Sequence, residues 1–223
     1  MPLALYGHPF SSYTQKVLIA LYENAIPHDF LSLDPGAPGQ PDHAAEWLRR
    51  WPLAKFPLLV DDGRTVVETS IIIEYLHLTH PGPAPLLPAD ALAALDVRFL
   101  DRYFDLHVMT PVQRAVEGAL ADDASLAAHG RAHAEARLEA AYGWLEGHFA
   151  DGRAWAAGAD FTLADCAAAP SLFYADWTHP IGAAYPNLRA YRARLLARPS
   201  VARAVDGGRP FRHYFPLGAP DRD

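Results

Sequence analysis

Segments with the pattern of β-strands are confined to the first 80 residues of this 223-residue chain. They are short apolar or alternating segments, and they are separated by segments with helical spacing. After residues 81–90, a stretch with four prolines, only helical spacing remains. The chain is therefore predicted to have an α/β domain at 1–80, a linker at 81–90 and an all-α domain at 91–223.

The topology of the α/β domain follows from its first segments. Residues 3–7 and 28–33 are predicted strands on either side of a predicted helix, 12–24, which makes them a parallel pair with a right-handed crossover. A DDG sequence between two later strand patterns is typical of a hairpin, which adds an antiparallel edge. This order is similar to the thioredoxin fold. The other predicted elements are helix 44–51, strands 56–60 and 64–68, and helices 69–80, 91–118, 124–149, 162–175 and 187–205.

Charge and cysteine content exclude several classes of protein. A net charge of −7 argues against nucleic acid as a partner. No long apolar run and no signal-peptide pattern occur, so we expect no membrane span and a cytoplasmic location. The single cysteine, Cys166, excludes a disulfide framework, and neither cysteine nor histidine has the spacing of a metal site. Cys166 lies in an apolar helical segment and is predicted to be inert.

Hydroxyl side chains are concentrated where the helix over 12–24 begins, in GHPFSSYTQKVLIAL. One of Ser11, Ser12, Tyr13 and Thr14 suffices to cap that helix. The others suggest a binding or catalytic role at the same turn.

Two further segments offer groups suited to a ligand. Pro57 opens a strand, where proline removes a ladder donor, and both a trans and a cis Phe56–Pro57 bond are compatible with the sequence. Thr69 is a candidate helix N-cap next to N–H groups that attract a carboxylate, and Glu68 is an acceptor for an ammonium group. A plain capped helix with a solvated carboxylate is the alternative interpretation.

The segment FTLADCAAAP contains a predicted capping box. Thr162 and Asp165 have the required spacing, with aspartate in place of the usual glutamate, and Phe161 and Cys166 occupy the positions of a hydrophobic staple. Asp165 is therefore interpreted as structural rather than catalytic.

Four segments, in this order along the chain, resemble those of cytosolic glutathione transferases of the serine type. The second is similar to the family's cis-proline motif, which favours a cis Phe56–Pro57 bond, and the third to its Glu-Ser motif, with Thr69 in place of serine. The resemblance covers nearly the whole chain and implies glutathione as co-substrate, transfer of alkyl or aryl groups in detoxification, a homodimer and no metal. The segments are SSYTQKVLIAL (11–21), KFPLLVDDG (55–63), ETSIIIEYL (68–76) and FTLADCAAAP (161–170).

The resemblance directs attention to the hydroxyl that meets the glutathione sulfur. A free thiol has a pKa of about 8.5, and a hydrogen bond to its charged form lowers that pKa by about one to two units. In serine- and cysteine-type relatives the contacting residue lies six positions before the apolar helix residue matched here by Val17, which points to Ser11. Ser12 and Tyr6 are the alternatives, and Thr14 is expected to face away.

The remaining site residues are likewise implied by the resemblance. Glu68 and Thr69 would hold the γ-glutamyl end, and the backbone of Phe56, before Pro57, would pair with the cysteinyl part. Lys55 is a candidate for a glutathione carboxylate, and the loop that ends at His43 for the glycyl end. The residues expected to line the electrophile pocket are Pro9, Phe10, Tyr13, Tyr103 and His107, with Phe211, Tyr214 and Phe215 as a lid.

The activity itself stays open between three hypotheses. The first is transfer of the glutathione thiolate to a small, apolar, electron-poor compound. The second is a glutathione-dependent isomerase, dehalogenase or ether-cleaving lyase, because the α/β domain prepares only the nucleophile. The third is a glutathione-binding module without activity, because a fold alone does not imply catalysis.

Overall fold

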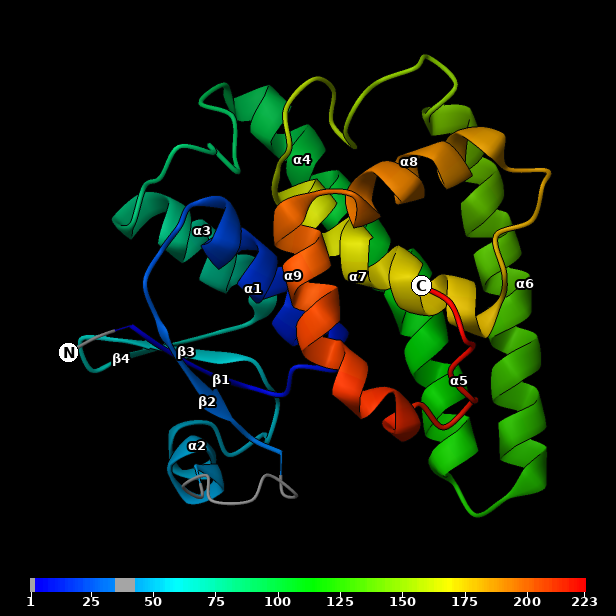
Figure 1. Ribbon diagram of the computed structural model, residues 1–223, viewed down its shortest axis with the longest axis horizontal. Coiled ribbons are helices and arrows are strands. Elements are labelled where there is room, and N and C mark those ends of the chain that lie inside the picture. Colours follow the sequence, from blue (N-terminus) through cyan, green and yellow to red (C-terminus); the bar gives the residue numbers. More distant parts are fainter. Residues whose placement is uncertain (1–2, 35–42) are drawn as a thin grey trace.

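The computed structural model describes residues 3–34 and 43–223 of the chain. A small sheet with its helices occupies one end of the molecule, and a helical assembly occupies the other (Figure 1). The element order agrees with the predicted fold class. The elements are β1 (Ala4–Gly7), α1 (Ser12–Glu23), β2 (Asp29–Ser32), α2 (Ala44–Arg50), β3 (Leu58–Asp61), β4 (Arg64–Val67), α3 (Thr69–Thr79), α4 (Ala91–Tyr103), the π-helix η1 (Phe104–Met109), α5 (Thr110–Leu120), α6 (Ala124–His148), α7 (Leu163–Thr178), α8 (Pro186–Leu196), α9 (Pro199–Gly208) and the 3-10 helix η2 (Arg209–Tyr214).

The sheet has the strand order β2-β1-β3-β4. β1 pairs in parallel with β2 and antiparallel with β3, so Leu5 lies opposite Phe30 on one side and Leu59 on the other. The β3–β4 hairpin turns at Asp62 and Gly63, whose φ angles of 44° and 87° are those of a tight turn that glycine and aspartate tolerate. The predicted parallel pair and antiparallel edge are both present.

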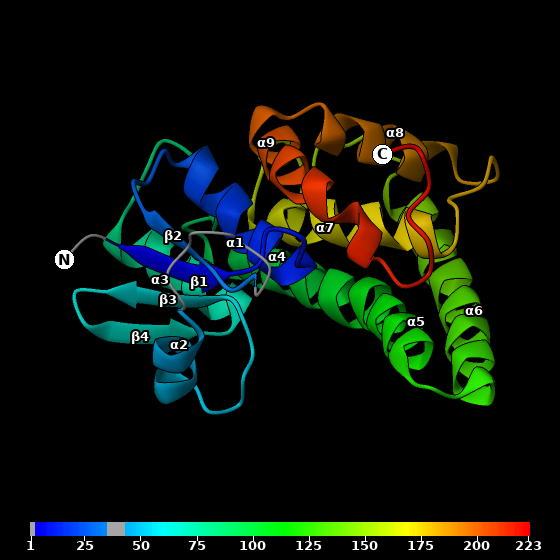
Figure 2. The same cartoon turned by 60° about the horizontal axis from the view of Figure 1, so that its bottom comes forward.

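The two faces of the sheet carry alternate side chains of the same strands. Leu5 and Leu59 belong to the main core, which includes the apolar residues of α1 and α3. Tyr6 and Leu58 belong to a smaller cluster with Trp47 of α2. Because successive strand residues face opposite sides, α1 and α3 cover one face and α2 the other (Figure 2). This alternation determines which side chains can reach the loop before α1.

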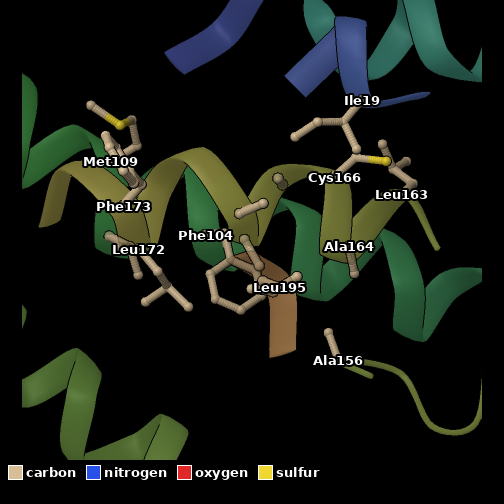
Figure 3. Packing of buried hydrophobic residues seen from close by; sticks show 14 of the residues in the cluster. Ile19, Phe104, Met109, Ala156, Leu163, Ala164, Cys166, Leu172, Phe173 and Leu195 are labelled. Atoms are coloured by element: carbon tan, nitrogen blue, oxygen red, sulfur yellow. The ribbon is translucent and has the colours of Figure 1, made fainter. Parts of the chain in front are cut away.

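Helix α7 is the centre of the helical half. It contacts α1 and α4, and every residue from Leu163 to Trp177 is buried. Figure 3 shows Leu163, Cys166 and Phe173 of this helix among the apolar side chains of its neighbours, with Ile19 of α1 close to Cys166. Helix α1 is therefore packed directly against the helical half, which couples the two parts of the chain.

The predicted helix 91–118 is wrong in its middle. The structure divides it into α4, the π-helical turn Phe104–Met109 and α5. Pro111 lies just beyond this turn; proline lacks an N–H, and its ring excludes the carbonyl four residues earlier from the regular α ladder. The wider π turn accommodates that break, and periodicity alone does not reveal it.

The predicted helix 187–205 is also wrong, because the chain forms two helices there. α8 ends at Leu196 and α9 begins at Pro199, which occupies the first turn of the new helix. Proline favours a first-turn position and disfavours α conformation in the residue before it. Arg198 accordingly has extended backbone angles, φ −75° and ψ 130°.

The capping box at the start of α7 is present as predicted. Asp165 accepts hydrogen bonds from the N–H of Thr162 at 2.9 Å, the N–H of Ala156 at 2.8 Å and the hydroxyl of Tyr191 at 2.7 Å. The adjacent Cys166 is fully buried, and burial raises the pKa of its thiol well above the usual value. Both residues are part of the core, and neither reaches a cavity described below.

The segment between α3 and α4 and the apolar character of the helices also bear on the sequence predictions. Residues 80–90, between α3 and α4, contain no helix or strand, while the domain boundaries themselves stay predictions. Within residues 3–34 and 43–223, no helix combines the length and apolar character that crossing a bilayer requires.

Candidate functional site

Two neighbouring cavities lie where the sheet meets the helical half. The larger has a volume of about 770 Å³ and extends along the start of α3 and the inner face of α4. The smaller, about 230 Å³, extends from the start of α1 to α5 and the C-terminal segment. Phe56 and Gln113 line both, so the cavities adjoin each other. The smaller one is lined by Phe10, Ser11, Ser12, Phe56, Met109, Val112, Gln113, Val116, Tyr174, Tyr214, Phe215 and Pro216.

Ser11 is the N-cap of α1 and lines the smaller cavity. Its backbone is extended, with φ −76° and ψ 126°, and its hydroxyl oxygen accepts from the N–H of Thr14 at 3.2 Å. A hydroxyl that accepts one hydrogen bond still has its own hydrogen to donate. Ser11 therefore caps the helix and presents a donor to the cavity at the same time.

The other hydroxyls near this turn have different surroundings. Ser12 is buried and lines the same cavity, so it stays an alternative donor. Tyr13 lines the larger cavity, and burial raises the pKa of its hydroxyl to about 12. Thr14 is fully buried against Gly7, where an added Cβ would lie 2.7 Å from its side chain. Tyr6 lies in the cluster on the α2 face, on the opposite side of the sheet from α1.

The start of α3 faces the larger cavity. The helix begins at Thr69, and the N-cap is Glu68, whose side chain makes no capping hydrogen bond within the described residues. Thr69 is therefore not the N-cap, as the sequence suggested, but the first helical residue. Glu68, Thr69 and Ser70 all line the cavity, which combines a carboxylate with the positive end of a helix.

Phe56 and Pro57 both line the larger cavity, and Phe56 also lines the smaller one. Their peptide bond is cis, as the resemblance favours. Lys55 also lines the larger cavity, and its carbonyl accepts from the indole N–H of Trp47 at 3.1 Å. His43 instead lies edge-on to Tyr6, at 6.1 Å between ring centroids. Residues 35–42, which precede it and were also candidates for the glycyl end, lie outside the described residues.

A buried ion cluster connects the walls of the larger cavity. Lys16 of α1 is 1% exposed and lies 2.6 Å from Asp101 of α4 and 2.8 Å from Asp105 of η1. Its ammonium also donates to the hydroxyl of Ser70 at 3.1 Å, and Ser70 in turn donates to Asp101 at 2.8 Å. Arg102 adds a second cation, 2.8 Å from Asp101. Helices α1, α3 and α4 are thereby fixed to one another.

Sequence inspection missed this cluster. Burial raises the pKa of Asp105, and the nearby Lys16 ammonium opposes that shift. The signal was present: Lys16 is followed by the apolar run VLIAL, and Asp101 and Asp105 have the spacing of one helix face. A charged residue within an apolar helical stretch requires a buried counter-ion.

The predicted electrophile pocket is only partly assembled. Phe10, Tyr214 and Phe215 line the smaller cavity, whereas Tyr13 lines the larger one. Pro9 lies in the loop two residues before Ser11, and its carbonyl accepts a hydrogen bond from the side-chain amide of Gln15 at 3.0 Å.

Tyr103 and His107 lie elsewhere, which corrects their proposed place in the pocket. Tyr103 donates to the carbonyl of Ala141 of α6 at 3.2 Å and stacks on Trp144 at 4.3 Å. His107 lies against Tyr103, with ring centroids 5.1 Å apart. The two share a helix face, as predicted, but that face is directed to α6. Phe211, expected in the lid, packs on the His8 ring at 4.7 Å.

Within the part of the chain that the structure describes, no group of three or more His, Cys, Asp or Glu side chains is arranged to hold a metal ion. The two adjoining cavities are lined by hydroxyl, carboxylate and apolar side chains, and the larger one also by the cations Lys55, Arg98 and Arg102.

Comparison with known families agrees with this arrangement. Residues 5–84 match the family model described as "Glutathione S-transferase, N-terminal domain", and residues 114–194 match "Glutathione S-transferase, C-terminal domain". Glutathione S-transferase U8 of Arabidopsis thaliana is 31% identical over 52% of this chain and 49% of its own length. The chain thus spans about half the length of the curated relatives it matches first.

Two further comparisons extend over nearly the whole chain. A probable maleylacetoacetate isomerase of Vibrio cholerae is 26% identical over 94% of this chain and 98% of its own. The solved structure of a glutathione S-transferase from Methylobacterium radiotolerans, in complex with glutathione sulfonate, is 30% identical over 92% of this chain and 95% of its own, with a TM-score of 0.74. The chain therefore belongs to the glutathione S-transferase family.

Proposed function

We propose that the protein is a glutathione transferase that joins the thiolate of glutathione to small, uncharged electrophiles. Glutathione would occupy the larger cavity, with its sulfur directed to Ser11 at the entrance of the smaller one. The observation that carries this proposal is the position of Ser11, a helix N-cap whose hydroxyl hydrogen is available to the cavity. Donation to a thiolate, together with the positive end of α1, favours the ionised nucleophile.

The walls of the larger cavity match the two ends of the tripeptide. Glu68 offers an acceptor for the γ-glutamyl ammonium group, and the free N–H groups at Thr69 and Ser70 offer donors for its carboxylate. Phe56 lines both cavities, and its backbone is proposed to pair with the cysteinyl part where glutathione would cross between them. Lys55 is proposed for the glycyl carboxylate. Glutathione keeps the cytosol reducing, and a cytoplasmic location belongs to the same proposal.

The smaller cavity favours transfer to neutral acceptors over the alternatives. Its lining is apolar except for serine, tyrosine and glutamine groups, and none of its described lining residues is cationic. An acceptor with carboxylates, such as the compound named by the isomerase relative, would meet no opposite charge there. A screen of acceptors would distinguish transfer from isomerase, dehalogenase and lyase activity. It would also distinguish transfer from glutathione binding without turnover.

Glutathione binding is tested by thermal unfolding. At about a hundredfold excess over Kd, a ligand that binds only the folded state stabilises it by about 2.7 kcal/mol, or roughly 5–10 °C in Tm for a chain of this size. Glu68→Gln is expected to weaken glutathione binding by about 10- to 100-fold, because it removes a charged acceptor.

Glu135→Gln is the matched control, because Glu135 is exposed on α6 and lines neither cavity. No shift in Tm for the wild type at millimolar glutathione would refute the proposal. Equal binding by Glu68→Gln and Glu135→Gln would remove Glu68 from the site.

A homodimer is also proposed, on the evidence of an exposed apolar stripe. Leu92, Leu95, Phe99 and Leu106 are 73%, 59%, 53% and 55% exposed and recur at helical spacing along one side of α4 and η1. Water-exposed apolar side chains at this density indicate a protein interface. Leu106 also lines the larger cavity, so a second copy would lie beside bound glutathione.

The stripe is tested by the variant Leu95→Glu/Phe99→Glu. Sedimentation or light scattering is expected to show a dimer for the wild type and a monomer for this variant, because two buried charges per copy oppose association. Leu120→Glu, on an exposed leucine outside the stripe, is expected to stay dimeric. A monomeric wild type, or a dimeric double variant, would contradict the proposed interface.

A further inference from the structure

The loop that presents Ser11 is held by side chains from outside it. In residues 8–11, between β1 and α1, the Pro9 carbonyl accepts from the side-chain amide of Gln15 at 3.0 Å. The Phe10 carbonyl accepts from the hydroxyl of Tyr174 at 2.6 Å. Each of these two peptide groups is therefore fixed by a specific donor, one from α1 and one from α7.

The amide sides of the loop are fixed as well. The N–H of Phe10 donates to Nδ1 of His8 at 3.1 Å, and the N–H of Ser11 donates to the carbonyl of His8 at 3.0 Å. With the two carbonyl contacts, every backbone polar group between Pro9 and the N–H of Ser11 has a partner.

The two side-chain donors are also bonded to each other. The Gln15 amide donates to the Tyr174 hydroxyl at 3.3 Å, in addition to its bond with Pro9. Gln15 is 2% exposed and Tyr174 is 3% exposed. Because the tyrosine oxygen accepts from Gln15, its hydrogen is directed to the Phe10 carbonyl. Tyr174 lines the smaller cavity, but its only hydroxyl hydrogen is already used and does not reach a bound sulfur.

We propose that Tyr174 and Gln15 are positioning residues for Ser11, which fix the two peptide groups before it and so aim its hydroxyl at the sulfur of glutathione. This proposal rests on the proposed function. It assigns part of the preparation of the nucleophile to α7, which belongs to the helical half of the chain. Displacement of a catalytic group by about 1 Å can cost roughly a hundredfold in rate.

Packing around the pair independently limits its movement. Phe10 lies edge-on to the Tyr174 ring at 5.3 Å, and the backbone of α9 closes the other side. A Cβ added at Gly208 would lie 2.8 Å from the Gln15 amide nitrogen and 3.3 Å from the Pro9 carbonyl. Glycine at this position therefore leaves the space that the Gln15–Pro9 contact occupies.

The test is Tyr174→Phe, which removes one oxygen and keeps the ring packing. Amide hydrogen exchange in the unliganded protein is expected to be faster at Phe10 and Ser11. Ultraviolet titration of the thiolate is expected to show the pKa of enzyme-bound glutathione raised by about one unit, which lowers kcat about tenfold below both pKa values. KM for glutathione is expected to stay within about twofold, because the groups around Glu68 are untouched.

Tyr142→Phe is the matched control. Tyr142 is also fully buried, and its hydroxyl also donates to a backbone carbonyl, that of His179 at 2.9 Å, away from the loop. A general loss of stability would affect both variants, whereas the exchange of Phe10 and Ser11 and the pKa of the bound thiol are expected to change only in Tyr174→Phe. Gln15→Met is expected to act like Tyr174→Phe, and the double variant to show less than the sum of the two effects.

The outcomes separate this inference from the proposed function. Unchanged exchange at Phe10 and Ser11 in Tyr174→Phe would overturn the positioning role. A raised thiol pKa in Ser11→Ala but not in Tyr174→Phe would also overturn it, while leaving Ser11 as the donor. If Ser11→Ala itself left the thiol pKa unchanged, Ser11 would not be the sulfur donor, and the positioning role would fall with it.

Discussion

Replacing Ser11 with alanine is expected to lower kcat/KM for glutathione and a chloronitroaromatic acceptor by about 10- to 100-fold near neutral pH. A hydrogen bond to a charged group contributes about 1.5–3 kcal/mol, which corresponds to about one to two units in the pKa of the bound thiol. Ser11 has the available hydrogen and the place in the smaller cavity that this role requires.

The difference in rate between the wild type and Ser11→Ala should depend on pH. The wild type is expected to hold the bound thiol at a lower pKa than Ser11→Ala does. Below both pKa values the variant has about 10- to 100-fold less thiolate, and above both values the two proteins are equally ionised. The difference in rate should therefore be largest at acidic pH and close as pH rises, which a pH profile of kcat measures.

Loss of the helix cap must be separated from loss of the sulfur contact. Ser11→Gly also lacks the hydroxyl but costs only a few tenths of a kcal/mol as a cap, so its activity should fall as far as that of Ser11→Ala. Ser11→Thr keeps a hydroxyl and should retain a lowered thiol pKa. A normal rate in Ser11→Ala together with a large loss in Ser12→Ala would transfer the role to Ser12.

Lys16→Met is expected to lower the free energy of unfolding by about 3–5 kcal/mol. Removing one partner of a buried ion pair leaves uncompensated charge, and Lys16 lies between two carboxylates that are themselves nearly buried. Urea denaturation at a fixed protein concentration measures the change. Lys55→Met is the matched control, because Lys55 is exposed, and its effect should stay within about 0.5 kcal/mol.

Acidification should reduce the loss in free energy of unfolding that Lys16→Met causes. Burial already raises the folded-state pKa of Asp105 above its usual value, and loss of the Lys16 ammonium removes the main opposing influence. For an acid whose folded pKa is raised, ionisation costs stability as pH rises from the unfolded to the folded pKa. The deficit should therefore be full at neutral pH and narrow as pH falls through that range. A constant deficit would show that lost packing, not charge, dominates.

The sequence predicted the features of the fold that depend on local pattern. Short apolar segments identified the strands around Leu5 and Leu59, and the DDG turn identified the hairpin. The capping box at Asp165 followed from residue type and spacing. The errors at Pro111 and Pro199 share a physical cause: helical periodicity continues through a proline even where the backbone does not.

The sequence could place candidate site residues only where a single turn contains them, and their roles stay predictions. Ser11, Glu68 and Thr69 each lie at the start of a helix, although Glu68 rather than Thr69 is the N-cap of α3. Tyr103 and His107 were misplaced because spacing shows that two residues share a face but not which neighbour the face meets. Lys16 and Tyr174 were missed because each is far along the chain from its partner. Lys16 pairs with Asp101 of α4, and Tyr174 of α7 pairs with Phe10 in the loop before α1.

The π-helical turn Phe104–Met109 divides one long helical segment into α4 and α5, so that each can direct its side chains to a different surface. A π turn holds one extra residue, which rotates everything after it by about 100° relative to an uninterrupted helix. The side of α4 that bears Leu95 and Phe99 is thus oriented independently of the side of α5 that bears Val112 and Val116. Lengthening or shortening this turn would change which side chains line the smaller cavity, while the sheet and the groups proposed to bind glutathione stayed in place.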